Sequence, residues 1–173
     1  NHGPTGVVTI DGIYKEDETL TANTDAIKDD EGIKPNSFTY QWYRGTTRID
    51  GATGAAYTLK QDDVNKTINV EVRYTDNYDT KEQVTYISTA TVENVNDRAV
   101  GKPVIVGFAK QKATLSVFDS VKTLGIITDE DGMPNSGTFL YTWYRTLNAT
   151  TTIIKEVTGD AGATYILQQA DVG

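Results

Sequence analysis

The chain contains one pattern twice. The segment SFTYQWYR at Ser37–Arg44 recurs as TFLYTWYR at Thr138–Arg145. The segment GATGAAYTLKQDDV at Gly51–Val64 recurs as GDAGATYILQQADV at Gly159–Val172. The copies lie about a hundred residues apart, and a period of that length corresponds to a whole domain per copy rather than one turn of a solenoid. The repeat therefore predicts two tandem domains.

Residues 1–97 form the first predicted domain and residues 98–173 the second. Ten Tyr, fifteen Gly and many Thr and Val favour β-strands joined by tight turns. The clearest alternation runs over Ile68–Tyr74, where every second residue is apolar, as in a strand with one buried face. Strands are expected at Val7–Ile10, Thr19–Asn23, Ser37–Arg44, Thr46–Ile49, Ala56–Leu59, Thr67–Thr75 and Gln83–Val92. Seven short antiparallel strands in one domain predict a β-sandwich.

Several segments of the first copy resemble a known family. Trp42 resembles the buried tryptophan on the third strand of immunoglobulin-like sandwiches, and Tyr57–Leu59 resembles their fifth strand. Together with EDETLTANTD and TATVENVND, these segments are similar to the tandem bacterial Ig-like, or cadherin-like, repeats of giant RTX-type surface adhesins. The resemblance covers nearly all of the first copy and most of the second.

This resemblance implies an all-β chain of two tandem immunoglobulin-like β-sandwich domains. It implies a secreted protein at the bacterial cell surface, where the repeats act as extender modules in cell adhesion or biofilm formation. The resemblance also implies two kinds of binding partner. These are the neighbouring repeats of the same chain and a ligand on a host or biofilm surface.

The second copy ends early relative to the first. It reaches Asp171-Val172-Gly173, where the counterpart of Thr67–Val92 would begin. We therefore expect the second domain to lack its last two strands. Because one of these strands would pair with the strand that carries Trp143, a chain–chain contact that completes the second copy is a further expected partner.

Charge and composition argue against several classes of partner. The chain has 16 basic and 24 acidic residues, a net charge of −8, whereas nucleic acids and anionic membranes bind basic surfaces. We expect neither nucleic-acid binding nor membrane insertion. The chain has no cysteine, which is typical of bacterial extracellular proteins and of cytosolic ones.

The residues that most enzymes need are scarce. The only histidine is His2, and the absence of cysteine excludes thiol chemistry. No phosphate-binding Gly-rich loop or HExxH motif is found. The sequence therefore predicts a protein that is not an enzyme.

Acidic clusters predict calcium binding at three places. Calcium takes six to eight oxygen ligands from carboxylates, amides and backbone carbonyls in loops. The candidate ligands are Asp29, Asp30 and Glu31 in the first copy, Asp129, Glu130 and Asp131 in the second, and Asn94, Asn96 and Asp97 at the junction. Asp76, Asn77 and Asp79 add oxygen donors in the loop between the sixth and seventh strands, at the junction end of the domain or at the opposite end. The junction is similar to the calcium-binding linker of cadherins. An alternative stays open, because Asp and Gly clusters also form ordinary turns.

One segment is specific to the second copy. Thr146–Glu156 is longer than its counterpart in the first copy, and such loops often carry binding function. Two alternatives to the extender therefore remain: a glycan- or protein-binding module that uses this hairpin, and a non-catalytic accessory domain of a secreted enzyme.

Overall fold

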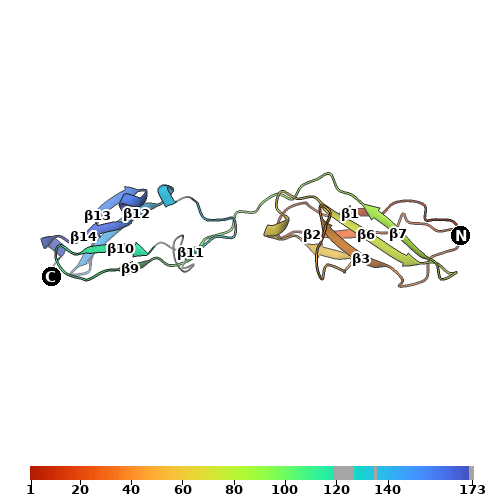
Figure 1. Ribbon diagram of the computed structural model, residues 1–173, viewed down its shortest axis with the longest axis horizontal. Helices are drawn as coiled ribbons and strands as arrows, with labels where there is room; N and C mark the ends of the chain where they lie inside the picture. The colour runs from red at the N-terminus through yellow and green to blue at the C-terminus, as the bar shows by residue number, and fades with distance from the viewer. Residues whose placement is uncertain (119–126, 135, 172–173) are drawn as a thin grey trace. The chain divides into compact units, whose positions relative to one another are not determined.

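The computed structural model describes residues 1–118, 127–134 and 136–171, which form two compact units, Asn1–Val95 and Asn96–Gly173. Every strand pair in the sheets is antiparallel (Figure 1). The described ranges contain short 3-10 helices but no α-helix. The chain is thus all-β, in agreement with the class predicted from the sequence.

Unit 1 contains two sheets. Its strands are β1 (Thr9–Asp11), β2 (Thr19–Asn23), β3 (Thr39–Arg44), β4 (Thr47–Arg48), β5 (Ala56–Thr58), β6 (Ile68–Thr75) and β7 (Lys81–Tyr86). One sheet has the order β1-β2-β5 and the other β4-β3-β6-β7, and the 3-10 helix η1 (Gln61–Asp63) links β5 to β6. The period of two in β6 places alternate apolar side chains in the interior, as predicted.

Both sheets of unit 1 contribute to one hydrophobic core. Leu20 from β2 and Trp42, Val70 and Val72 from β3 and β6 are fully buried. Trp42 stacks on Tyr57 of the other sheet, with 5.8 Å between the ring centroids. Two antiparallel sheets around one core are consistent with a β-sandwich.

The end of the seventh strand differs from the prediction. A strand was expected over Gln83–Val92, but β7 ends at Tyr86. There the amide oxygen of Asn69 accepts the backbone N–H of Ser88, at 2.8 Å, so the regular strand pairing does not continue. The chain then crosses to Val64, which forms a parallel bridge with Val92.

The described sheets of unit 2 contain two or three strands each. Its strands are β8 (Val100–Gly101), β9 (Val104–Val106), β10 (Thr114–Phe118), β11 (Ile127–Thr128), β12 (Leu140–Leu147), β13 (Thr150–Thr158) and β14 (Thr164–Ile166). The sheet orders are β14-β10-β9, β11-β8 and β12-β13. Its 3-10 helices are η2 (Ser136–Thr138), η3 (Asp160–Gly162) and η4 (Gln169–Asp171). Within the described part of unit 2, β13 is the one strand that pairs with β12, whereas the corresponding β3 has two neighbours.

A glycine follows the first strand of an equivalent strand pair in each unit. Gly12 follows β1 with φ +130°, and Gly107 follows β9 with φ +134°. A Cβ on Gly12 would lie 2.6 Å from the carbonyl oxygen of Thr19, and one on Gly107 would lie 2.6 Å from that of Thr114. Only glycine fits this close backbone approach, so the two copies share a backbone constraint.

Candidate functional site

The two acidic loops form the same turn. In the first, the Asp29 carboxylate accepts the backbone N–H of Glu31 at 2.9 Å, and the Asp29 carbonyl accepts the N–H of Gly32 at 3.0 Å. In the second, the Asp129 carboxylate accepts the N–H of Asp131 at 3.1 Å. The first acid of each cluster thus stabilises its own loop, and the glycine that follows has positive φ in both.

The other predicted calcium ligands are distributed between the two units. In unit 1, Asp30 and Asn94 are exposed. In unit 2, Asn96 and Glu130 are exposed, and the backbone N–H of Asp97 donates to the Asp131 carboxylate at 2.6 Å. The structure therefore brings Asp97 and Asp131 together within unit 2.

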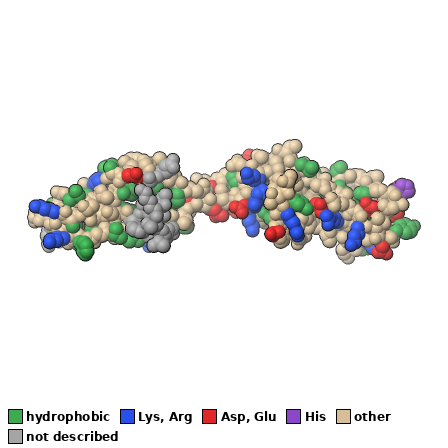
Figure 2. Space-filling model, viewed as in Figure 1, with side chains coloured by type: hydrophobic (Ala, Val, Ile, Leu, Met, Phe, Trp, Pro, Cys, Tyr) green, Lys and Arg blue, Asp and Glu red, His purple; other side chains and the backbone are tan. Residues whose placement is uncertain are grey.

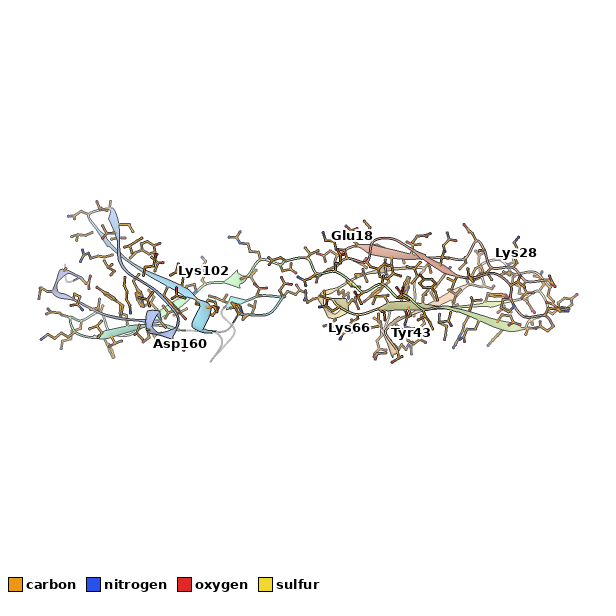
Figure 3. The ribbon with its side chains drawn as sticks, turned by 90° about the horizontal axis from the view of Figure 1, so that it is seen from above. Glu18, Lys28, Tyr43, Lys66, Lys102 and Asp160 are labelled. Carbon is orange, nitrogen blue, oxygen red and sulfur yellow. The ribbon has the colours of Figure 1, made fainter. Side chains whose placement is uncertain are left out.

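A cluster of carboxylates lies at one end of unit 1. Asp29, Asp76 and Glu82 place carboxylate oxygens within 4.8 Å of one another. Lys28, the neighbour of Asp29, lies at this end of the unit, and Lys66 lies toward the other (Figure 3). Only Asp29 belongs to the calcium set predicted from the first acidic loop. Asp76 follows β6 and Glu82 lies on β7, so sequence proximity could not link them.

Asp76 is the buried member of the carboxylate cluster. Its Oδ1 accepts the backbone N–H groups of Tyr78 and Thr80, at 2.8 and 2.7 Å. Its Oδ2 is buried and has no hydrogen-bond partner. The Asp29 carboxylate accepts the hydroxyl of Tyr74 at 2.7 Å, and this bond is the main cause that lowers the pKa of Asp29. The Tyr74 pKa is raised by its burial and by the same carboxylate.

A second buried carboxylate organises the other end of unit 1. Asp63 is fully buried and accepts three hydrogen bonds: from the Tyr57 hydroxyl at 2.8 Å, the Lys60 backbone N–H at 2.9 Å and Arg44 Nε at 2.7 Å. Burial and the Asp63 carboxylate raise the pKa of Tyr57 well above its ordinary value. We call Tyr57, Asp63 and Arg44 the clamp of unit 1.

Unit 2 contains the same clamp. Asp171 accepts the Tyr165 hydroxyl at 2.8 Å, the Gln168 backbone N–H at 2.7 Å and Arg145 Nη1 at 3.4 Å. The Gln168 N–H is the largest cause that lowers the pKa of Asp171. Trp143 donates its indole N–H to the Gly162 carbonyl at 2.8 Å.

The indole bond also has a counterpart in unit 1, where Trp42 donates to the carbonyl of Gly54 at 2.9 Å. The sequence predicted the tryptophan and the strand of Tyr57 as repeated scaffold, but it did not identify the clamp. The signal was present: tyrosine and aspartate are six residues apart in both copies, and an arginine follows each WY pair.

An apolar hollow opens beside β12 in unit 2. It measures about 430 Å³, and its lining includes Ile105, Val117, Phe139, Leu140 and Trp143. In unit 1 the corresponding strand β3 is paired along this edge with β6, from Thr39↔Arg73 to Arg44↔Ile68. The expected chain–chain contact that would complete the second copy beside Trp143 stays a prediction.

The segment specific to the second copy, Thr146–Glu156, forms the tip and much of the second strand of the β12–β13 hairpin. Asn148 and Ala149 form its two-residue turn, with φ of 48° and 64°. Tyr144, Leu147 and Ile153 on the hairpin are each more than half exposed. The hairpin thus presents apolar side chains to solvent.

Among the described residues, the sole histidine has its ring close to one carboxylate, that of Glu31. His2 lies at the surface of unit 1 (Figure 2), with a side chain that is 77% exposed, and its ring nitrogen lies 3.1 Å from the Glu31 carboxylate. On the drawn face of unit 1, basic and acidic side chains are interspersed (Figure 2). In the described part of the chain, no helix combines the length and the apolar character needed to cross a membrane.

Comparison with known proteins identified no related protein. No family model matches the chain, and no curated protein is similar to it. The function must therefore be argued from the repeated scaffold and the clusters described above.

Proposed function

We propose that this chain consists of two tandem immunoglobulin-like repeats that act as non-catalytic extender modules of a large secreted bacterial adhesin. The observation that carries the proposal is the duplication of the clamp. The residues that recur most clearly in the sequence, Trp42 and Tyr57 with their counterparts, hold the scaffold rather than a reaction centre. A module repeated for its scaffold serves length and stiffness.

The strand order of unit 1 supports the immunoglobulin-like class. Sheets of order β1-β2-β5 and β4-β3-β6-β7 match a sandwich in which the third and sixth strands pair at the centre of one sheet. Trp42 occupies the third strand and is fully buried, as the family resemblance implies. The cysteine-free core replaces the disulfide of antibody domains with Leu20 and Val70, which are both fully buried.

The extender role is tested by measuring reach. One, two and four copies of the chain are inserted between a surface anchor and a fluorescent protein, and the height of the fluorophore above the surface is measured. The proposal predicts a height that grows in proportion to the number of copies. A height that stays constant as copies are added would contradict it.

A binding module is the second candidate, because the β12–β13 hairpin exposes Tyr144, Leu147 and Ile153. A glycan and protein array separates the two functions. An extender gives no specific signal on the array. A specific signal that disappears when Thr146–Glu156 is trimmed to a short turn would assign the recognition function to the hairpin.

A further inference from the structure

Asp76 carries a buried oxygen that nothing in unit 1 satisfies. Its Oδ1 accepts two backbone N–H groups, whereas Oδ2 is buried without a partner, and the whole residue is inaccessible to solvent. A buried carboxylate oxygen is unfavourable unless a donor, a proton or a metal ion compensates it. Asp76 therefore requires a ligand that the side chains of unit 1 do not supply.

The surroundings of Asp76 make a cation the best candidate. Carboxylate oxygens of Asp29 and Glu82 lie within 4.8 Å of that of Asp76 and of each other, so three acids share one small volume. Like charges at this spacing destabilise one another unless a cation lies between them. Lys34, whose backbone N–H bonds the carbonyl of Thr75 next to Asp76, directs its side chain to an ion pair with the exposed Asp79 instead.

We propose that Asp29, Asp76 and Glu82 bind one Ca²⁺ ion. All three donors are hard carboxylate oxygens, which suit Ca²⁺ and disfavour metals that prefer nitrogen or sulfur. The donors come from a loop, a second loop and a strand, and such an irregular set suits the flexible coordination of Ca²⁺ better than the strict octahedron of Mg²⁺. Water and backbone carbonyls complete the coordination.

A neighbouring group fits this assignment. Glu31, in the same turn as Asp29, also has a buried carboxylate oxygen without a partner, Oε2. One carboxylate oxygen of Glu82, Oε1, accepts the Asn1 side-chain amide at 2.7 Å, so the ion would take the other oxygen or displace this bond. A bound ion would join the turn at Asp29, the loop after β6 and the start of β7. It would therefore stiffen this end of unit 1.

Calorimetric titration of the full chain with CaCl₂ at constant ionic strength tests the proposal. Wild type should bind Ca²⁺ with a dissociation constant of about 10⁻⁴–10⁻³ M, the range of extracellular modules, and Mg²⁺ more weakly. Asp76→Asn, which keeps the side-chain shape, should raise the dissociation constant at least tenfold. Asp79→Asn, an exposed change in the same loop, should bind like wild type. Undiminished Ca²⁺ binding in Asp76→Asn would overturn the proposal.

Folding stability gives a second readout. At a Ca²⁺ concentration tenfold above the dissociation constant, the folding equilibrium constant of wild type should rise about elevenfold. Without metal, Asp76→Asn should be at least as stable as wild type, because it removes a buried unpaired charge. With Ca²⁺ the order should reverse.

Glu82→Gln, at a half-buried strand position, guards against misfolding of the Asp76 variant and should also lose the Ca²⁺ response. A wild-type stability that does not change with Ca²⁺ up to tens of millimolar would refute the site. The extender proposal is independent of this result, since its test measures reach and not metal binding.

Discussion

Removal of one hydroxyl, in Tyr57→Phe, tests whether the clamp holds unit 1 together. The hydroxyl donates to Asp63 Oδ2 at 2.8 Å, and Asp63 has no access to solvent. Phenylalanine preserves the ring that stacks on Trp42, so the change isolates the hydrogen bond. A hydrogen bond to a charged group contributes about 1.5–3 kcal/mol. We expect Tyr57→Phe to lower the free energy of unfolding of unit 1 by this amount.

Urea unfolding followed by tryptophan fluorescence measures this loss. A Trp143→Phe background leaves Trp42 as the only tryptophan, so the signal reports unit 1. The slope with urea should stay unchanged while the midpoint falls. Tyr78→Phe is the matched control, because the Tyr78 side chain is largely exposed and its loss should change stability by less than about 0.5 kcal/mol.

The pH dependence of stability provides an independent test of the clamp. Burial and Asp63 raise the pKa of Tyr57 above its ordinary value of 10.0. The stabilising neutral hydroxyl is therefore fully effective below pH 10 and is lost as pH rises through the folded-state pKa. The difference between wild type and Tyr57→Phe should shrink in strong alkali. A loss below about 0.5 kcal/mol at neutral pH, or a gap that does not change in alkali, would refute this account of the clamp.

Three further changes have defined outcomes. Gly12→Ala places a Cβ 2.6 Å from the Thr19 carbonyl at positive φ and should destabilise unit 1 by about 1–3 kcal/mol in urea unfolding; a neutral result would contradict the close approach. Ala149→Gly relieves φ of 64° in the hairpin turn and should raise the stability of unit 2 by about 0.5–1 kcal/mol, measured by hydrogen exchange. The lowered pKa of Asp171 predicts stability that is present above pH 3.8 and lost as pH falls through the folded-state pKa. In acid titration followed by hydrogen exchange, Asp171→Asn should flatten that loss; an unchanged acid transition would exclude this role.

Much of the strand pattern could be predicted because it follows from local periodicity. The strand at Thr19–Asn23 has the predicted bounds, and the alternation over Ile68–Tyr74 lies within β6. The seventh strand was predicted too long because nothing local marks its end. It ends at Tyr86 because the side-chain amide oxygen of Asn69, on the neighbouring strand, accepts a hydrogen bond from the backbone N–H of Ser88. Such a bond depends on strand pairing and cannot be read from one segment.

The candidate site also combines features that the local sequence predicts with features that only the folded unit creates. The turn chemistry of Asp29 and Gly32 is local, and the acidic loop was recognised from its composition. Asp76 and Glu82 join Asp29 only because β6 and β7 return the chain to the same end of unit 1. The burial of Asp76 leaves its Oδ2 without water or another partner, and this burial is a property of the packed unit and not of the residue type.

The sequence by itself determined the duplication, the β-rich class and the residues that recur as scaffold, because periodicity and residue type act over short distances along the chain. The tertiary structure decided which carboxylates meet and which are buried. It showed that Asp63 and Asp171 are the centres of one repeated clamp. It also showed that Asp76 holds an oxygen without a partner beside two other acids. These contacts join residues from separate strands and loops, so folding alone brings them together.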